Sequence, residues 1–395
     1  MQLDYTSPSF ARQAQDAVVG VDVVVNAVGI FREDGNASFD AVHVKGPCSL
    51  FAHAAKAGVR RIIQISALGA AAEAATPYLR SKAAGDQCAR AFAGEAVVVR
   101  PSLVFAPAGA SSRMFLRLAW LPWVVLPGGG RQCVQPLHLD DLVEGLAKLA
   151  AADTPLPADS AGAGLDAVGP TPLSLADYLR ALGRAIGARP RIIGVPQRWA
   201  QAAARLLQRV PGSLVTTDAL AMLRQGSCAD PAAWQRLVAR PLRCATGSGA
   251  QGFIEPDESD VLRDRIALAN LLPLLRASVS AMWLVTAWVS AFVYPVADSL
   301  ALLQRSHMPT ALAPLALYGA SALDAALGLA MWMRRWRAVV YRLQLTLILF
   351  YTLVITVALP EFWAHPYGPV LKNVPLLALI YALLRLEARD GPGDR

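Results

Sequence analysis

Four long apolar stretches follow one another in the last third of the chain, and they restrict its fold more than any other feature. Each approaches the roughly 20 residues that a helix needs to cross a bilayer. They largely lack the polar stripe at helical spacing that a buried soluble bundle requires. We therefore expect residues 271–388 to form an all-α bundle of four transmembrane helices, with spans at Ala277–Ala297, Ala311–Met333, Ala338–Leu359 and Pro369–Leu386.

The arginines beside these stretches predict the orientation of the chain in the membrane. Arg334, Arg335 and Arg337 lie between the second and third stretches, and Arg385 and Arg389 follow the fourth. The link between the third and fourth stretches contains neither Lys nor Arg. Because cytoplasmic loops are enriched in basic residues, the pattern predicts a multi-pass protein of the cell inner membrane whose N-terminal part is cytoplasmic.

Charge and cysteine content narrow the chemistry. The net charge of +8 includes the arginines beside the apolar stretches, where they meet anionic lipid, so we do not expect nucleic-acid binding. The cysteines form no Cys-x-x-Cys pair and have no histidine at metal-ligand spacing, which predicts neither a structural zinc site nor a disulfide framework. A reduced, cytoplasmic setting is expected for all five, Cys48, Cys88, Cys133, Cys228 and Cys244.

The N-terminal part alternates short apolar runs with amphipathic stretches. Val21–Asn26, Arg61–Ser66 and Ala96–Arg100 are predicted buried strands, and Phe39–Ala57 and Tyr78–Phe92 are predicted helices between them. This alternation is typical of β-α-β units around a parallel sheet. Residues 1–150 are therefore expected to form a Rossmann-like α/β domain.

Residues 151–270 are expected to form a smaller substrate lobe and a linker. A helix is predicted at Ser174–Ile186, a strand at Arg191–Val195 and an amphipathic helix at Arg198–Val210. The second half of Gly226–Asp264 is polar and weakly periodic, so we interpret it as linker. Its Gly-x-Gly-x-x-Gly pattern at 247–252 is a weak match to a cofactor loop, because no strand precedes it.

Ser66, Tyr78 and Lys82 have the spacing of a proton-transfer set. On a helix, the side chains of Tyr78 and Lys82 lie one turn apart on one face, so the ammonium can favour the ionised phenol. A phenol with the usual pKa of ~10 is a poor acid-base catalyst at neutral pH. We therefore predict that Tyr78 exchanges the proton, that Lys82 lowers the pKa of Tyr78 and that Ser66 holds the substrate oxygen.

Several motifs occur together in a recognisable order. Asn26-Ala27-Val28-Gly29, Ser66, the Tyr78–Lys82 segment and Arg100–Phe105 resemble the extended and atypical short-chain dehydrogenase/reductases, over about residues 1–195. The branch that is most similar includes the NAD(P)-binding accessory subunit of respiratory complex I. Both Asn26 and Ser66 end predicted strands, and the carboxyl edge of an open α/β sheet is where ligands bind.

The resemblance implies an NAD(P) cofactor and a set of residues around it. Lys82 would hold the nicotinamide ribose, and Asp4 would lie beside the adenine. Other matched positions would border the cofactor or pack near the nicotinamide. The implied cofactor-binding residues are Asp4, Asn26, Gly29, Lys82, Pro101 and Val104.

One element of this family is not found where it is expected. A Gly-x-x-Gly-x-x-Gly turn after the first strand normally lets the pyrophosphate approach a helix N-terminus. No such turn precedes Val21–Asn26. We expect that the true start lies upstream or that the chain is a fragment, and cofactor binding by this chain alone is in doubt.

The apolar C-terminal part, about residues 271–386, resembles a DoxX-like four-span domain, and relatives of that fold include a membrane subunit linked to quinone reduction. Asp324 lies near the middle of the second stretch. A charge at that depth is costly, so it serves either an interhelical contact or a site for a proton or polar head group.

Together these features predict a membrane-anchored NAD(P)-dependent oxidoreductase of the short-chain dehydrogenase/reductase type. Its substrate would be a carbonyl or a quinone-like apolar compound. The alternative is a non-catalytic nucleotide-binding module that senses redox state or assists assembly of a membrane redox complex.

Overall fold

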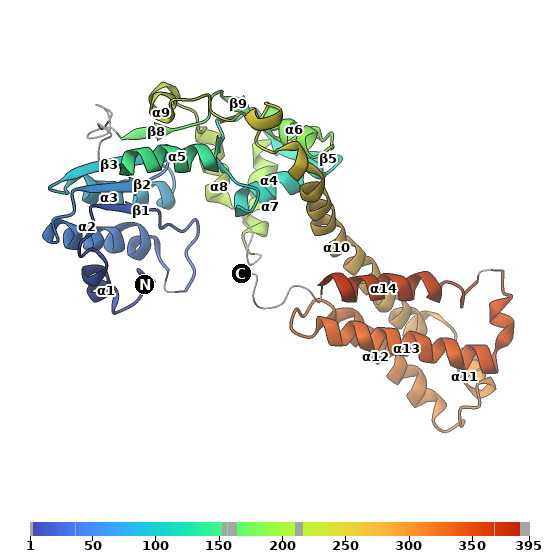
Figure 1. Ribbon diagram of the computed structural model, residues 1–395. Helices are drawn as coiled ribbons and strands as arrows, with labels where there is room; N and C mark the ends of the chain where they lie inside the picture. The colour runs from blue at the N-terminus through green and yellow to red at the C-terminus, as the bar shows by residue number, and fades with distance from the viewer. Residues whose placement is uncertain are drawn as a thin grey trace. The chain divides into compact units, whose positions relative to one another are not determined.

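A computed structural model describes residues 3–35, 37–151, 156, 164–209, 216–366 and 368–387. The chain divides into two compact units, Met1–Ala267 and Leu268–Arg395. The division falls inside one long helix, α10 (Pro256–Trp288). Figure 1 labels the helices and strands of both units.

The first unit is built on a parallel four-stranded sheet with the strand order β1-β2-β3-β8. Its strands are β1 (Val23–Asn26), β2 (Arg61–Ile65), β3 (Glu95–Pro101) and β8 (Leu165–Ala167). Valine and isoleucine fill the two central strands, which are buried on both faces, as parallel sheets require. The predicted Rossmann-like α/β fold is confirmed.

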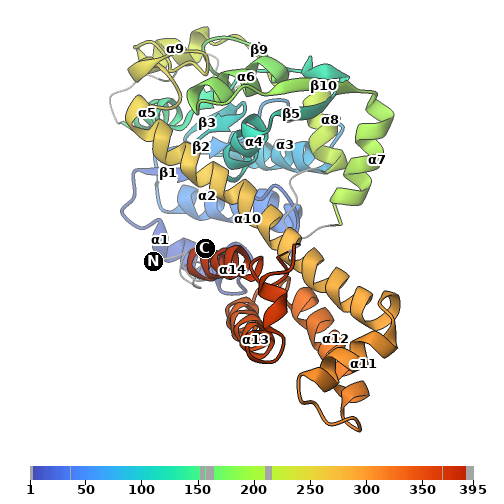
Figure 2. The same ribbon diagram turned by 90° about the vertical axis from the view of Figure 1, so that its right-hand side faces the viewer.

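Helices cover both faces of this sheet (Figures 1 and 2). On one face, Ile62 and Val98 pack against α1, α2 and α3. On the other face, Ile63 and Val97 pack against α5 and α9, because alternate side chains of a strand point to opposite sides. The bounds are α1 (Phe10–Ala17), α2 (Gly46–Lys56), α3 (Pro77–Arg90), α5 (Leu139–Ala150) and α9 (Ala232–Val238).

The local sequence explains where α3 begins. Pro77 occupies the first helical position, where its missing N–H costs nothing. Thr76 caps the helix, and its hydroxyl accepts a hydrogen bond from the N–H of Leu79. The predicted helix at Phe39–Ala57 also forms, but it starts as a π-helical stretch, Asp40–Lys45, that leads into α2.

A second core supports the smaller lobe. Phe115 and Leu116 of α4 pack against Tyr178 and Leu182 of α6, and Leu126 of β5 joins them. The predicted helix and strand at residues 174–186 and 191–195 are confirmed as α6 and β10. The lobe contains α4 (Ala110–Trp120), β5 (Trp123–Pro127), α6 (Leu175–Ala185), β10 (Arg191–Val195), α7 (Gln197–Leu207) and α8 (Thr217–Gln225).

Three further strand pairs join the lobe together. β5 pairs in parallel with β10, β4 pairs in parallel with β7, and β6 pairs antiparallel with β9. The short strands are β4 (Val104–Phe105), β6 (Cys133–Val134), β7 (Leu137–His138) and β9 (Leu173–Ser174).

The expected linker in the second half of residues 226–264 is wrong. Phe253 and Ile254 belong to the core of the lobe, and α10 begins at Pro256. Earlier in the segment, Trp234 is fully buried against the sheet. These anchors are spaced irregularly, so they produce no helical or strand period in the sequence. The glycine pattern at 247–252 forms a tight turn around a 3-10 stretch, Gly249–Gln251.

The prediction of no disulfide framework is also wrong. Cys48 pairs with Cys88, which ties α2 to α3 with a Cα separation of 5.2 Å. Cys133 pairs with Cys228 at 6.2 Å. The partners are 40 and 95 residues apart in the chain, so only the tertiary fold reveals them. Cys244 is a free thiol.

The second unit is helical. It contains the later part of α10, a π-helical stretch at Val289–Val293 and four further helices. Three helices are long and apolar enough to cross a membrane by length and composition: 256–293, 313–330 and 337–358. The predicted fourth span has a helix of only 15 residues, α14, so four spans are not confirmed. The bounds are α11 (Val296–Arg305), α12 (Ala313–Ala330), α13 (Arg337–Ala358) and α14 (Asn373–Glu387).

Apolar side chains fill the inside of this bundle and also cover its outside. Trp283, Tyr341 and Ile380 are buried in its core, whereas Phe292 and Val357 are largely exposed. An apolar outer surface of this kind is what a helix bundle presents to lipid. At one end, Arg276 and Arg337 form ion pairs with the buried Glu387.

Asp324 is buried in this bundle, with 8 % of its surface exposed. Among the described residues, its Oδ1 atom has no hydrogen-bond partner. The two predicted roles, an interhelical contact and a site for a proton or polar head group, both stay predictions.

Candidate active site

A pocket of about 550 Å³ lies at the carboxyl ends of β1, β2 and β3. Tyr78 and Lys82 of α3 line one wall, together with Ser66 after β2 and Gly29 after β1. The lobe supplies the opposite wall from α4 and α8. The structure therefore gathers the three predicted catalytic side chains at the sheet edge where ligands of this fold class bind.

Lys82 is buried and points its ammonium group at the main chain. Its Nζ donates a hydrogen bond to the carbonyl oxygen of Ile65 at 3.1 Å. Burial lowers the pKa of Lys82 to about 8, although the nearby Asp86 carboxylate acts in the opposite direction. Near pH 7 the side chain is thus a cation whose proton is held less firmly than usual.

Tyr78 lies among aromatic rings. Its ring centroid is 5.2 Å from that of Phe31, 6.1 Å from that of Phe39 and 5.6 Å from that of His43. Burial raises the pKa of Tyr78 to about 12. The prediction that Lys82 lowers this pKa is therefore wrong, because loss of solvent around the phenol dominates. Tyr78 carries its proton at neutral pH.

Ser66 does not offer its hydroxyl hydrogen to the pocket. Its Oγ donates to Oδ2 of Asp86 at 2.6 Å, and both residues are buried. Burial raises the pKa of Asp86, while the Ser66 hydrogen bond opposes that rise. A serine hydroxyl has a single hydrogen, so Ser66 meets a substrate oxygen as a donor only after the contact with Asp86 changes.

Asp86 belongs to the site although its sequence pattern was overlooked. It follows Lys82 by four residues, as Lys82 follows Tyr78, so all three side chains lie on one face of α3. A Tyr-x-x-x-Lys-x-x-x-Asp pattern was the available signal. In the described part of the chain, Oδ1 of Asp86 has no hydrogen-bond partner, which leaves half of this buried carboxyl unsatisfied.

His43 is the second residue that sequence reasoning missed. Its Nε2 accepts a hydrogen bond from the N–H of Ile30 at 3.0 Å, so the neutral ring carries its hydrogen on Nδ1. Nδ1 lies 2.8 Å from Oγ of Ser81, which in turn donates to the carbonyl oxygen of Tyr78. Burial, helped by the charge of Lys82, lowers the pKa of His43 to about 4. A lone histidine on an apolar face gives no sequence signal for this role.

The loop after β1 approaches α3 closely. A Cβ atom added at Gly29 would lie 2.9 Å from Nζ of Lys82 and 3.4 Å from Nε2 of His43. A side chain at this position would therefore displace the lysine or fill the space beside it. Pro101 and Val104 line the same pocket, as the resemblance implied.

Asn26 and Asp4 do not line this pocket. Asn26 is buried and donates to Oε1 of Gln64 at 2.6 Å, while the Tyr5 hydroxyl donates to its Oδ1 at 2.8 Å. Asp4 lies on the surface, where it accepts hydrogen bonds from Thr6. Asn26 thus fastens β1 to β2 and to the N-terminal segment, and the contact of Asp4 with an adenine stays a prediction.

Two protein families match separate parts of the chain. Residues 1–158 match the NAD dependent epimerase/dehydratase family, and residues 280–381 match the DoxX-like family. The chain therefore joins an epimerase-type, short-chain dehydrogenase/reductase-like domain to a DoxX-like helical domain, and the predicted fusion is confirmed.

Curated relatives match the first of these domains. The chain is 26% identical over 195 residues to the mitochondrial NADH-ubiquinone oxidoreductase 40 kDa subunit of Neurospora crassa, covering 49% of this chain and 50% of that protein. It is 33% identical over 131 residues to the mitochondrial NADH dehydrogenase [ubiquinone] 1 alpha subcomplex subunit 9 of Mus musculus, covering 33% and 35%. The chain thus spans half or less of the length of these relatives.

A solved structure of similar fold is a nucleoside-diphosphate-sugar epimerase from Staphylococcus aureus. It has a TM-score of 0.49 and 16% identity, and the match covers 62% of this chain and 81% of that one.

Proposed function

We propose that this chain is a membrane-anchored NAD(P)-dependent oxidoreductase that reduces a neutral, apolar carbonyl or quinone-like compound. Its α/β domain would lie on the cytoplasmic side of the inner membrane. The observation that carries the proposal is the convergence of Tyr78, Lys82 and Gly29 on one pocket with a largely apolar opposite wall.

The residues of the pocket fit the nicotinamide and ribose end of the cofactor. The bare backbone at Gly29 leaves space beside Lys82, and the ammonium group is a donor that can meet ribose hydroxyls. Pro101 and Val104 present apolar surface for the nicotinamide ring. When bound, NAD(P)H supplies the hydride for the reduction.

Tyr78 supplies the proton. Since the pKa of Tyr78 is raised to about 12, the phenol is protonated at neutral pH and can donate to a carbonyl oxygen as that oxygen gains negative charge. The ammonium of Lys82 stabilises the phenolate that remains. One hydride and one proton convert a carbonyl to an alcohol, so the step balances without a further reductant.

The lining of the pocket favours an apolar substrate. Leu103, Met114, Phe115, Met222 and Leu223 face it. Within the described lining, Lys82 is the sole charged side chain. A substrate with a diphosphate group would need several cations or a bidentate arginine. A quinone or aromatic aldehyde needs an apolar slot and a few oriented polar groups, as small-molecule sites generally provide.

The test uses the full chain in lipid nanodiscs. Oxidation of NADH and NADPH is followed with a short-chain quinone and with an aromatic aldehyde, and cofactor binding is measured by calorimetry. Tyr78→Phe is expected to lower kcat by roughly 10²–10⁴-fold while the Kd for the cofactor is kept. Tyr294→Phe, an exposed tyrosine outside the pocket, is the matched control. Unchanged turnover in Tyr78→Phe would refute the assignment.

A second function has its own support. The curated relatives are named as subunits of NADH-ubiquinone oxidoreductases, and the Ser66 hydroxyl is engaged by Asp86. A nucleotide-binding module of a membrane redox complex would need no free hydroxyl. Cofactor binding without turnover of any quinone or aldehyde would favour this module over the enzyme.

A further inference from the structure

Helix α7 of the lobe carries an apolar row on its solvent side. Trp199 and Leu206 are 64% and 66% exposed, and they lie seven residues apart on one face of the helix. Ala202 and Ala203 lie between them and are exposed too. A large apolar row held outward on a surface helix marks an interaction site more often than chance exposure.

The opposite side of α7 fixes the helix in place. Ala204 is fully buried, and Gln197, Ala200 and Gln201 are partly buried on the same side. The helix lies against β5 of the lobe. The exposed row therefore belongs to a packed element whose inner face is already used.

Arginines accompany the apolar row. Arg198 and Arg205 are exposed and repeat the seven-residue spacing one position before Trp199 and Leu206. From residue 178 to residue 217 the chain contains seven arginines and no Asp or Glu. Positive charge around this helix is therefore not neutralised by acids of the same stretch.

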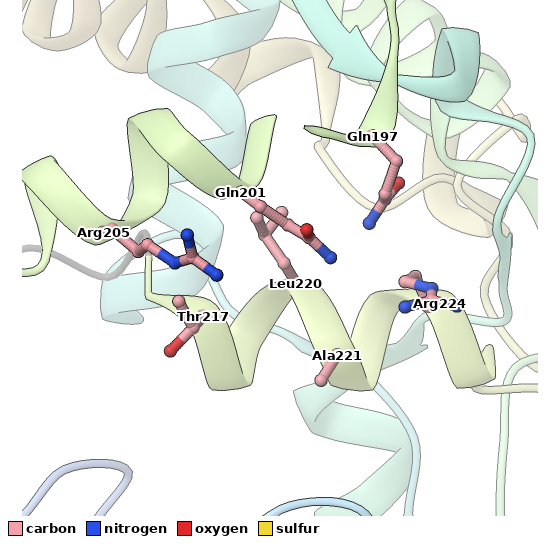
Figure 3. A pocket seen from close by; sticks show the side chains of 7 residues that line it. All are labelled: Gln197, Gln201, Arg205, Thr217, Leu220, Ala221 and Arg224. Atoms are coloured by element: carbon pink, nitrogen blue, oxygen red, sulfur yellow. The ribbon is translucent and has the colours of Figure 1, made fainter. Parts of the chain in front are cut away.

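A cleft of about 160 Å³ lies between α7 and α8. Figure 3 shows Gln197, Gln201 and Arg205 reaching from α7 toward α8, which contributes Thr217 and Arg224. Two guanidinium groups and two amides thus face a cleft whose described lining includes no acid. Nε2 of Gln197 is buried and has no hydrogen-bond partner among the described residues. Such a set of donors suits a phosphate group.

The neighbouring strands are apolar on their outer face as well. Trp123 and Val125 of β5 are 61% and 58% exposed, and Ile193 of β10 is the register partner of Val125. Val124 and Leu126 point to the other side, into the core. Two separate elements of one lobe therefore present tryptophan and aliphatic side chains to the outside.

We propose that α7 docks this lobe onto the surface of an anionic phospholipid bilayer. Trp199 and Leu206 enter the boundary between head groups and acyl chains, and Arg205 with the adjoining cleft holds a lipid phosphate. A helix with tryptophan and leucine on one side and arginine beside them is the type that lies in a membrane interface.

Charge and composition favour lipid over other partners. A second copy of the chain would bring the same arginines against each other, which costs energy at the contact. A nucleic acid would leave Trp199 and Leu206 without an apolar phase. The same chain also carries three helices long and apolar enough to cross a membrane, so a bilayer is within reach of the molecule.

The experiment places a fluorescent reporter on the exposed row of the full chain in nanodiscs. Ala203→Cys is labelled with an environment-sensitive dye in a Cys244→Ala background, which removes the free thiol. Gln235→Cys, exposed on α9, is the matched control. With phosphatidylglycerol present, the label at 203 is expected to shift its emission to the blue and to be quenched by spin-labelled lipid, whereas the label at 235 does neither.

Arginine variants and lipid composition separate the possible causes. Arg198→Gln with Arg205→Gln should weaken docking roughly 30-fold, since each basic residue near an anionic surface is worth a factor of about five. Equal emission from both labels overturns the proposal. An equal blue shift in pure phosphatidylcholine would assign the row to a protein contact, and loss of quenching on adding inorganic phosphate would reduce the site to a free-anion cleft. Either result also overturns bilayer docking.

Discussion

The two walls of the candidate active-site pocket differ in kind. On the sheet side, buried polar side chains hold one another by hydrogen bonds, such as that from Ser66 to Asp86. On the lobe side, Met114, Met222 and Leu223 offer flexible apolar surface with no fixed hydrogen bond to a ligand. A methionine adapts to many shapes, whereas a hydrogen-bonded set does not. Chemistry is therefore expected to depend sharply on the first wall and only weakly on the second.

The largest effect is expected from the lysine of the sheet-side wall. Lys82→Met removes the cation that would stabilise a phenolate and hold the ribose, so kcat/KM should fall by roughly 10²–10⁴-fold. Lys148→Met on α5, which does not line the pocket, is the control. Steady-state NAD(P)H oxidation measures both. Equal losses in the two variants would remove the distinction between the walls.

The Ser66–Asp86 contact should be visible in stability. Ser66→Ala leaves Asp86 buried without its donor, which is expected to cost about 1–3 kcal/mol in the free energy of unfolding. Replacing both, as Ser66→Ala with Asp86→Leu, should recover much of this loss because no buried polar group is left unpaired. Thermal unfolding of the full chain in nanodiscs provides the comparison. A double variant less stable than Ser66→Ala would contradict the contact.

The pH dependence reports on Lys82. Because burial lowers its pKa to about 8, kcat/KM should fall with rising pH above that value, about tenfold per unit, as the cation is lost. Stability should move the other way. An unfolded lysine keeps its proton up to the ordinary value of 10.5, so the folded chain loses its proton first and the free energy of unfolding rises between these values. Lys82→Arg should abolish the fall in activity.

The smallest effect is expected on the lobe-side wall. Met222→Ala removes apolar contact without disturbing a hydrogen bond, so KM for an apolar quinone should rise by roughly tenfold or less while kcat stays similar. Ala221→Gly on the other side of α8 serves as the control for helix integrity. A drop in kcat comparable to that of Lys82→Met would show that both walls take part in the chemistry.

Part of this site could be predicted from sequence because it depends on local geometry. The spacing of Tyr78 and Lys82 fixes their common helix face, and the ends of β1 and β2 fix the sheet edge. The Ser66–Asp86 bond and the role of His43 depend on which elements meet in space. The raised pKa of Tyr78 depends on burial, which a spacing argument does not contain.

The fold shows the same limit. Strands and helices with a clear period were predicted within a few residues, as with β2 and α6. The onset of α10 was missed because its first turns are polar and charged, and its packing relies on Leu262 and Ile266. The disulfides were missed because each joins positions far apart in the chain.

Helix α8 has two working sides, and this makes it a possible point of communication. Met222 and Leu223 line the pocket that contains Tyr78, while Thr217 and Arg224 line the cleft proposed to hold a lipid phosphate. A nine-residue helix is too short to bend independently at its two sides. A lipid that pulls on one side therefore turns the other, and membrane composition would act as an allosteric effector of substrate affinity.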